Sequence, residues 1–345
     1  MAMGRHIAAA AASLALLAAS SPATAAPPAP SWALAQIKLV TAHGLMAKSP
    51  ASFRPNDPLT QGDLATLASQ LSGIDQPIPL DPAAPATIAD LDAQLVQALD
   101  LGDSAQRFLD GARAAGLVPP TRFGTEAVAR LLGLRFDHPA AQESLELLPD
   151  QTATRAEAAY SAAKILRYKG WEVPYVQDLV ANFALPRLAG WPRTVAQTAV
   201  SLIGYPYVWG GTSELPQAPL GVPVPGGFDC SGFAWRVYKL AGYTDGGSLA
   251  TTLRGRTTYA MSGEVPRARR IGFARLQPAD LVFFGSRGPH SQPGQVDHMG
   301  VYLGGGWMIH ASGQGVLLTP ISSGGYRTRF AWGRRPLAEA GLASP

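Results

Sequence analysis

The chain has 345 residues, enough for two domains, and its composition of 47% hydrophobic and 15% charged residues is typical of a globular protein. A formal net charge of +4 is mild, and the arginines are scattered apart from a short cluster at residues 267–270. These features argue against a nucleic-acid-binding protein. The chain holds a single cysteine, Cys230, so a disulfide within the chain is excluded.

The first 25 residues have the pattern of an export signal. Arg5 and His6 precede an apolar run at residues 7–18, and Ala23-Thr24-Ala25 forms an A-x-A cleavage pattern. The run is shorter than the roughly 20 residues of a comfortable membrane span, although an uncleaved anchor helix is the alternative. We predict cleavage after Ala25 and a mature protein in the cell wall, the periplasm or the extracellular space.

Residues 31–168 predict an all-helical region. SWALAQIKLVTAHGLM is a helix pattern that ends near Gly44, and Thr60 with an acidic residue three positions later is typical of a helix N-cap. A related pattern of helix, loop and helix returns at residues 108–134. The loop and cap return again at residues 145–166, now with Thr154 as the cap. We interpret the region as a decayed three-part repeat.

PNDPLTQGDLA and ATRAEAA resemble the signature of S-layer homology modules. Only the third copy keeps Thr-Arg-Ala-Glu, at residues 154–157. The resemblance implies a compact helical trefoil that binds cell-wall polymers, with Arg155 in the signature. An all-helical accessory domain without a ligand is the alternative.

The rest of the chain differs from the helical region in its amino-acid composition. Residues 169–190 combine proline and aromatic residues and predict a packed connector. Residues 191–337 are rich in Gly, Tyr, Trp and short apolar strands and predict a second domain, followed by a tail at 338–345.

The stretch GGFDCSGFAWRVYKLAG places Cys230 at the start of a helix. Phe233, Val237 and Leu240 recur at helical spacing, whereas the preceding PVPGGF cannot be helical. Unsatisfied N–H groups and the helix dipole at this position would favour a thiolate and lower the thiol pKa. The alternative is a small buried hydrophobic residue.

DHMGVYLGGGWMIHASG, residues 297–313, predicts a β-hairpin around three glycines. If all three glycines form the loop, Gly300 faces His310, and His298 lies one diagonal step away on the same face. A two-residue loop would send the two histidines to opposite faces. A cysteine nucleophile needs a base and a third group that orients the base, and this hairpin supplies both.

Five blocks in order resemble the NlpC family of cell-wall cysteine peptidases: GYPYVWGGTS, FDCSGFAWRVYKLAGY, LQPADLVFFGS, DHMGVYLGGGWMIHASG and FAWGRRP. The resemblance implies a papain-like α+β fold in which the helix that carries the cysteine packs on a small antiparallel sheet. It implies Cys230 as nucleophile, His298 as general base and then acid, and His310 as the orienting residue.

The same resemblance gives three residues a substrate-binding role. Tyr207 matches a tyrosine near the substrate and the oxyanion, and Asp229 and Ser231 match residues that hold a free amine of the stem peptide. A helix cap is the alternative role for Asp229. The segment GRTTYAM departs from the pattern, since Gly255 and Met261 replace a proline and a glutamine.

We therefore expect an exported peptidoglycan hydrolase that cleaves the bond from γ-D-glutamate to diaminopimelate or lysine through a thioester. The alternatives are a passive wall-binding protein, or an acyl transferase or amidase on the same scaffold. The chemistry requires no cofactor and no metal, and Cys230 has no second cysteine to share a metal site.

Overall fold

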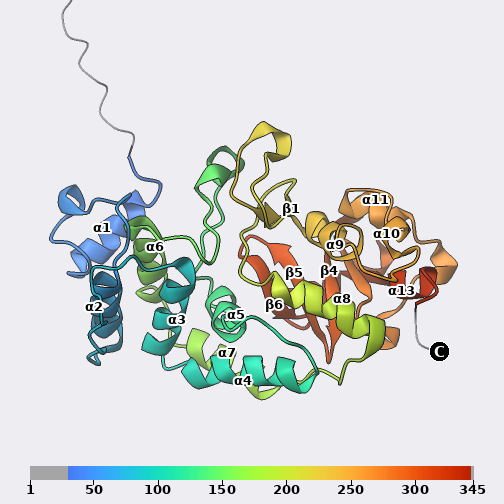
Figure 1. Ribbon diagram of the computed structural model, residues 1–345, viewed down its shortest axis with the longest axis horizontal. Helices are drawn as coiled ribbons and strands as arrows, with labels where there is room; N and C mark the ends of the chain where they lie inside the picture. Colours follow the sequence, from blue (N-terminus) through green and yellow to red (C-terminus); the bar gives the residue numbers. More distant parts are fainter. Residues whose placement is uncertain (1–29, 343–345) are drawn as a thin grey trace, which may run out of the picture. The chain divides into compact units, whose positions relative to one another are not determined.

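The structure is a computed structural model that describes residues 30–342 (Figure 1). From Trp32 onward the chain forms one compact unit. Its first part holds seven helices: α1 (Leu34–Ala42), α2 (Gln61–Ser72), α3 (Ile88–Ala98), α4 (Gly102–Ala114), α5 (Phe123–Leu131), α6 (Arg155–Ile165) and α7 (Glu172–Ala181). Within residues 30–342, no helix has both the length and the apolar character needed to cross a membrane. The predicted signal lies at residues 1–25, outside the described residues.

Three helix caps meet at the centre of the helical region. Thr60, Thr87 and Thr154 each accept a hydrogen bond from the backbone N–H three residues later, at the N-termini of α2, α3 and α6. The residues before them form a closed ring of backbone hydrogen bonds of 2.8 Å, in which Leu59 donates to Ala153, Ala153 to Ala86, and Ala86 to Leu59. This ring satisfies polar backbone groups that would otherwise be buried without partners.

The ring confirms a three-part arrangement and the caps at Thr60 and Thr154, but it corrects the position of the middle copy. The sequence pattern places that copy at residues 108–134, which cover the end of α4 and all of α5. The middle cap is instead Thr87, whose capping box with Asp90 starts α3. The motif Thr-x-x-Asp stands between alanines and prolines at this point, so it lacks the flanking pattern of the other two copies.

Arg155, the arginine of the intact signature, is an internal residue. Its guanidinium donates to the carbonyl oxygens of Phe53 (2.9 Å) and Met46 (2.6 Å) and to the carboxylate of Asp63 (2.6 Å). Only 8% of its side chain is exposed. All three nitrogens are thus engaged within the fold, and Arg155 has little capacity left for an external anion.

The second part of the chain is built on a five-stranded antiparallel sheet of order β6-β5-β4-β3-β7. Its strands are β3 (Leu281–Gly285), β4 (Val296–Gly304), β5 (Trp307–Ser312), β6 (Gly315–Pro320) and β7 (Phe330–Arg334). Strands β1 (Thr212–Ser213) and β2 (Gly227–Phe228) form a separate pair. The helices are α8 (Gly190–Ser201), α9 (Cys230–Tyr238), α10 (Leu249–Thr252), α11 (Thr258–Gly263), α12 (Tyr326–Arg329) and α13 (Pro336–Glu339).

Alternation along the strands explains how α9 and the sheet pack. Val301 and Ile309 point to the same side of the sheet and join the main core with Phe233 and Val237 of α9. Side chains on the other side form a smaller cluster around Phe284. The α+β fold with a helix on a small antiparallel sheet is therefore as the sequence predicts.

A buried arginine on α5 joins the helical region to the second part of the chain. Arg130 and Glu126 on α5 lie 3.0 Å apart (Nε to Oε2), with 3% and 0% of their side chains exposed. Arg130 also donates to the carbonyl oxygens of Gly204 and Gln314. These two residues lie in the loop after α8 and in the turn from β5 to β6, so α5 fixes both segments.

We expect Arg130→Met to lower the free energy of unfolding by about 3–5 kcal/mol, because it leaves the Glu126 carboxylate buried without its cation. Urea unfolding of the full chain measures this. The exposed pair between Arg113 and Asp110 is the matched control, and Arg113→Met should cost less than about 1 kcal/mol. Equal losses in the two variants would show that buried Arg130 contributes no more to stability than an exposed arginine.

Candidate active site

Cys230 is the first residue of α9, as predicted. The carboxylate of Asp229 caps the helix and accepts from the backbone N–H of Gly232 at 2.5 Å. Before the cap, Gly226 and Gly227 have φ angles of 158° and 140°, and Cβ atoms there would meet backbone at 2.6 and 2.9 Å. The glycines therefore let the chain turn into α9, and the thiol comes to lie 9% exposed at the helix N-terminus.

The two histidines of the hairpin meet, as predicted. His298 Nε2 lies 2.8 Å from His310 Nδ1, and His310 Nε2 lies 3.1 Å from the hydroxyl of Thr319 on β6. This chain of contacts fixes the orientation of both rings. His310 is fully buried, whereas His298 is partly exposed.

The register that brings them together has an unexpected origin. The turn itself has two residues, Gly305 and Gly306, and Gly304 pairs with Trp307. A two-residue turn alone would separate the histidines. The register shifts between Tyr302 and Gly304, however, and Val301 then pairs with Ile309 as a three-residue loop would require. One extra residue in β4 thus restores the predicted face.

The hairpin also reaches the thiol. The backbone of Met299, the residue after His298, hydrogen-bonds to the Cys230 sulfur. Helix α9 packs on both β4 and β5. The structure thereby brings Cys230, His298 and His310 to one place.

The protonation states differ from the sequence-based expectation. Burial raises the pKa of the Cys230 thiol to about 11 and lowers the pKa of His298 to about 4. Burial also holds the pKa of His310 well below its usual range, and the neighbouring His298 adds to this. These shifts favour a neutral thiol and neutral imidazoles at neutral pH. The helix N-terminus was expected to lower the thiol pKa, whereas burial of the sulfur raises it.

Thr258 contacts Cys230 and was missed by the sequence analysis. Its Oγ1 lies 3.3 Å from Cys230 Sγ, and the residue is 5% exposed at the start of α11. The residue stands in GRTTYAM, where we considered only Gly255 and Met261. Its hydroxyl can donate to the sulfur when the thiol proton leaves.

We expect Thr258→Val to slow alkylation of Cys230 by iodoacetamide about tenfold at pH 8, because the variant loses a donor to the thiolate. Thr258→Ser keeps a hydroxyl and should react at nearly the wild-type rate. Mass spectrometry of the labelled chain over time measures both. Equal rates for wild type and Thr258→Val would show that the hydroxyl does not stabilise the thiolate.

Asp229 and Ser231 belong to one hydrogen-bond network with Arg256. The guanidinium of Arg256 contacts both Asp229 oxygens, at 3.1 and 3.0 Å, and Ser231 Oγ at 2.7 Å. Asp229 also accepts from Ser231 Oγ and from the Gly210 N–H, both at 2.9 Å. The cap role weighed for Asp229 is thus present in the structure. Arg256 is a second residue that the sequence analysis missed.

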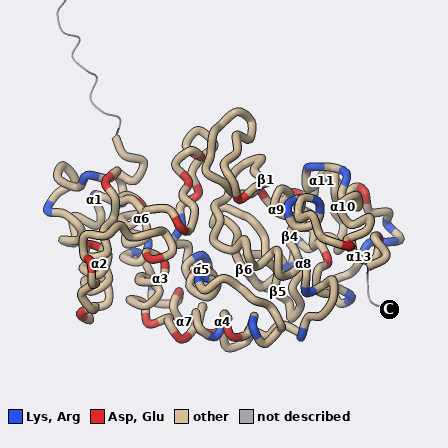
Figure 2. The backbone as a smooth tube through the Cα atoms, in the orientation of Figure 1, with Lys and Arg blue, Asp and Glu red and all other residues tan. Residues whose placement is uncertain are grey.

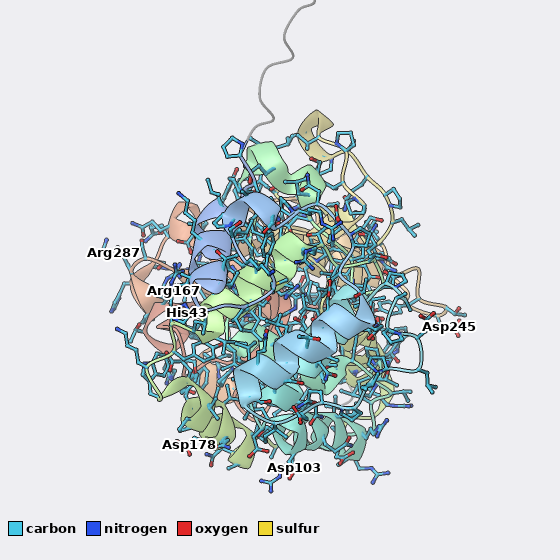
Figure 3. The ribbon with its side chains drawn as sticks, turned by 90° about the vertical axis from the view of Figure 1, so that its left-hand side faces the viewer. His43, Asp103, Arg167, Asp178, Asp245 and Arg287 are labelled. Carbon is cyan, nitrogen blue, oxygen red and sulfur yellow. The ribbon has the colours of Figure 1, made fainter. Side chains whose placement is uncertain are left out.

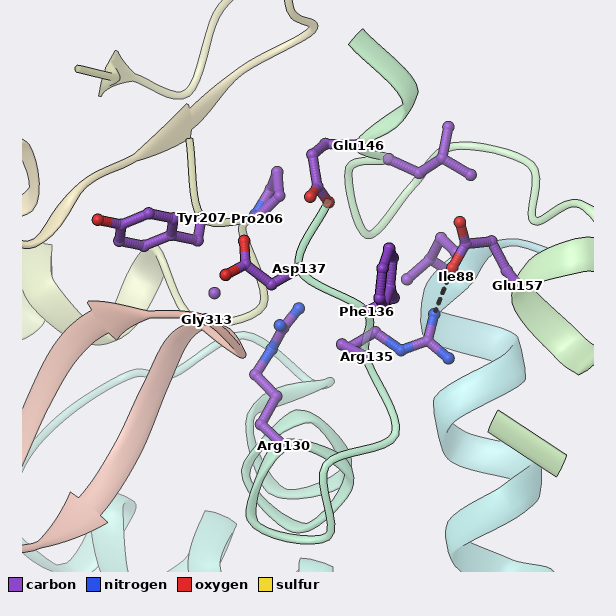
Figure 4. Close-up of a pocket in the computed structure, with 12 residues that line it drawn as sticks. Ile88, Arg130, Arg135, Phe136, Asp137, Glu146, Glu157, Pro206, Tyr207 and Gly313 are labelled. Atoms are coloured by element: carbon purple, nitrogen blue, oxygen red, sulfur yellow. Dashed lines mark ion pairs between the residues drawn. The ribbon is translucent and has the colours of Figure 1, made fainter. Parts of the chain in front are cut away.

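Tyr207 lies beside β2, where it forms a parallel bridge to Phe228. Burial raises its pKa, as do the nearby Cys230 and Asp229. Figure 4 shows Tyr207 and Asp137 on the wall of a small cavity that also touches Arg130 and Gly313. The cavity volume is about 20 Å³, room for about one water molecule, so it does not accommodate a peptide.

No group of three or more His, Cys, Asp or Glu side chains suited to a metal ion occurs among residues 30–342. A hydroxyl and backbone amides contact the sulfur, and two linked imidazoles lie on the strands that α9 packs against. They suit acyl transfer through a thiol nucleophile.

In the second part of the chain, a helix that starts at a cysteine packs on strands that carry two histidines, an arrangement that suits a cysteine peptidase. Residues 204–335 match the profile of the NlpC/P60 family, and residues 26–65 match that of the S-layer homology domain. The second part of the chain therefore matches the NlpC/P60 family, and both resemblances seen in the sequence are confirmed.

Individual relatives match only part of their length. The probable endopeptidase Rv2190c of Mycobacterium tuberculosis is 33% identical over 146 residues, which cover 41% of this chain and 30% of that protein. The gamma-D-glutamyl-L-lysine dipeptidyl-peptidase of Bacillus cereus is 34% identical, with 41% and 35% covered. The chain therefore spans about a third of the length of these curated relatives.

Among solved structures, an NlpC/P60 family protein from Bacillus cereus is 28% identical with a TM-score of 0.33. The match covers 45% of this chain and 43% of the Bacillus cereus chain. The NlpC/p60 domain of the peptidoglycan hydrolase SagA is 28% identical with a TM-score of 0.28. That match covers 41% of this chain and 97% of the SagA domain.

Proposed function

We propose that the chain is an exported peptidoglycan hydrolase that cleaves the amide bond between γ-D-glutamate and diaminopimelate or lysine in a stem peptide. The observation that carries the proposal is that α9, which starts at Cys230, packs on the two strands that carry the linked pair of His298 and His310. The family match and the names of the relatives agree with this substrate class.

The reaction starts with the Cys230 thiol and the His298 imidazole both neutral. The Cys230 thiol gives its proton to His298 as the sulfur attacks the peptide carbonyl, and His310, held by Thr319, orients the His298 ring. The carbonyl oxygen becomes an oxyanion, and the unsatisfied N–H of Cys230 at the helix start is the proposed donor to it.

Collapse of this intermediate breaks the C–N bond and leaves a thioester, while His298 gives its proton to the leaving amine. Water then attacks the thioester as His298 takes a proton from it. The γ-carboxyl group of the glutamate is released, and the proton returns to the sulfur. Neither step requires a metal or a cofactor.

Three further residues are proposed to bind substrate. Tyr207 is assigned to the peptide near the oxyanion. Ser231 and Asp229 are assigned to the free amine of the stem peptide, and Arg256 shares the carboxylate with that amine. The amine would therefore bind at the edge of an existing ion pair.

The proposed organisation keeps a signal at residues 1–25, a helical region at 31–168, a connector at 169–190, a peptidase domain at 191–337 and a tail at 338–345. The protein would act in the cell wall, the periplasm or outside the cell. The helical region is proposed as an accessory part that positions the enzyme at the wall.

The experiment that tests the proposal is digestion of purified peptidoglycan, with the released peptides identified by mass spectrometry. We expect fragments that begin with diaminopimelate or lysine. Products joined to an added amine instead of water would favour an acyl transferase, and the absence of released peptide would contradict the proposal.

A further inference from the structure

Positive charge is concentrated in one part of the chain. In residues 191–337, 14 Lys and Arg face 6 Asp and Glu, whereas residues 31–168 hold 11 Lys and Arg and 15 Asp and Glu. The mild net charge of +4 is thus the sum of an acidic helical region and a basic peptidase domain. Figure 3 views the helical part and shows Asp103 of α4 and Asp178 of α7 projecting outward.

Four arginines of the basic domain lie within nine residues of each other, and we name them the arginine surface: Arg267, Arg269, Arg270 and Arg275. They stand in two short 3-10 turns, Arg267–Arg269 and Phe273–Arg275, between α11 and β3. Arg267, Arg269 and Arg275 are exposed. Figure 2 shows the basic segments near α10, α11 and α13.

None of the four takes part in a salt bridge within residues 30–342. The two acidic residues nearest in sequence are already paired, Glu264 with Arg334 at 2.8 Å and Asp280 with Arg335 at 2.8 Å. Arg270 is held over the ring of Trp332 at 3.6 Å, where burial and then the charge of Arg267 lower its pKa.

The charge of Arg267 acts on Arg270, and among residues 30–342 no acidic side chain forms a salt bridge with any of the four. The positive charge of these side chains is therefore available to an external anion. In the helical region, by contrast, the signature cation Arg155 is already bonded to internal partners.

We propose that the arginine surface binds a linear polyanion of the envelope, a polymer that carries regularly spaced phosphate or carboxylate groups, and that the peptidase domain supplies this attachment. This rests on the proposed function, because it assigns the wall contact of the same enzyme. Arginine suits the role because its planar guanidinium binds phosphate and carboxylate groups through paired hydrogen bonds.

Binding of inorganic polyphosphate by the full chain tests the proposal. We expect the triple variant Arg267→Gln, Arg269→Gln, Arg275→Gln to lose at least about tenfold in affinity at low salt and to show a shallower dependence of log K on log salt. The matched control, Lys38→Gln, Arg107→Gln, Arg113→Gln, removes the same charge from exposed positions on the helical region. It should stay within about twofold of the wild type.

Binding of poly-glutamate, a polymer that carries carboxylate groups instead of phosphates, is measured in the same way. Binding to both polymers or to either one supports the proposal. It is overturned if the wild type binds neither polymer, if the two variants lose affinity equally, or if vesicles of anionic phospholipid bind more tightly at equal phosphate concentration.

Cleavage of a soluble stem peptide by the same variants separates the two proposals. The triple variant should cleave it at the wild-type rate, since none of its residues lies in the active site. Polymer binding without any cleavage by the wild type would contradict the hydrolase function alone, and cleavage without polymer binding would contradict the arginine surface alone.

Discussion

Replacing Cys230 by alanine should abolish cleavage of stem peptides, with a fall in kcat of at least about 10⁴-fold. The sulfur is the atom that forms the thioester, and neither Thr258 nor the histidines can replace it as a nucleophile at this position. The rate of product release from a defined tripeptide, followed by mass spectrometry, measures the loss.

The fold should survive this change. Cys230 is a small residue at a helix start, and the cap by Asp229 depends on the carboxylate and not on the sulfur. Thermal unfolding of Cys230→Ala should therefore stay close to that of the wild type. Retained cleavage in a folded variant would contradict the assignment of Cys230.

Alkylation of Cys230 by iodoacetamide should accelerate steeply with pH. Only the thiolate reacts, and a thiol pKa of about 11 predicts a rise of about tenfold for each pH unit between pH 7 and pH 10. The pKa is raised, so the reactive form is abundant only above about pH 11 and becomes rarer as the pH falls. The expected span over these three units is thus about 10³-fold.

An ion pair between Cys230 and His298 would give a different profile. The thiolate would then persist at neutral pH, and alkylation would reach a plateau well below pH 8. Such a plateau would contradict the neutral resting pair. The comparison uses the intact chain without substrate, so it is independent of the proposed bond.

Much of the site could be predicted from the sequence because its signals are local. Helical spacing after Cys230, with glycines before it, determines where α9 starts. The glycine turn places His298 and His310 on the same hairpin. Local spacing cannot show the register shift near Leu303, since it depends on how β4 packs between its neighbours. The predicted contact was therefore right although the turn has two residues instead of three.

Other features depend on contacts that are distant in the sequence. Thr258 lies 28 residues from Cys230, and Arg256 lies 27 residues from Asp229. The thiol pKa depends on how completely the surrounding core covers the sulfur. The middle cap at Thr87 was missed because the ring that identifies it joins residues from three separate loops. The internal role of Arg155 likewise follows only from the fold.

The helical region has two observed features that bear on its role. Arg130 bonds it to the loop before Tyr207 and to the turn between β5 and β6, and Glu143 accepts from the backbone N–H of Trp209 at 2.8 Å. It therefore contacts both segments that border the site. A part of the chain held in this way can support the active site as well as position the enzyme.

Product analysis in water enriched in ¹⁸O tests the central claim most directly. The wild type is incubated with a defined stem peptide that contains γ-D-glutamyl-diaminopimelate or γ-D-glutamyl-lysine. The masses of the products are then measured by mass spectrometry. The account predicts a free amine on the diaminopimelate or lysine fragment and one ¹⁸O atom in the new γ-carboxyl group of the glutamate. Cleavage at another bond, or an intact peptide in the presence of folded enzyme, would contradict it.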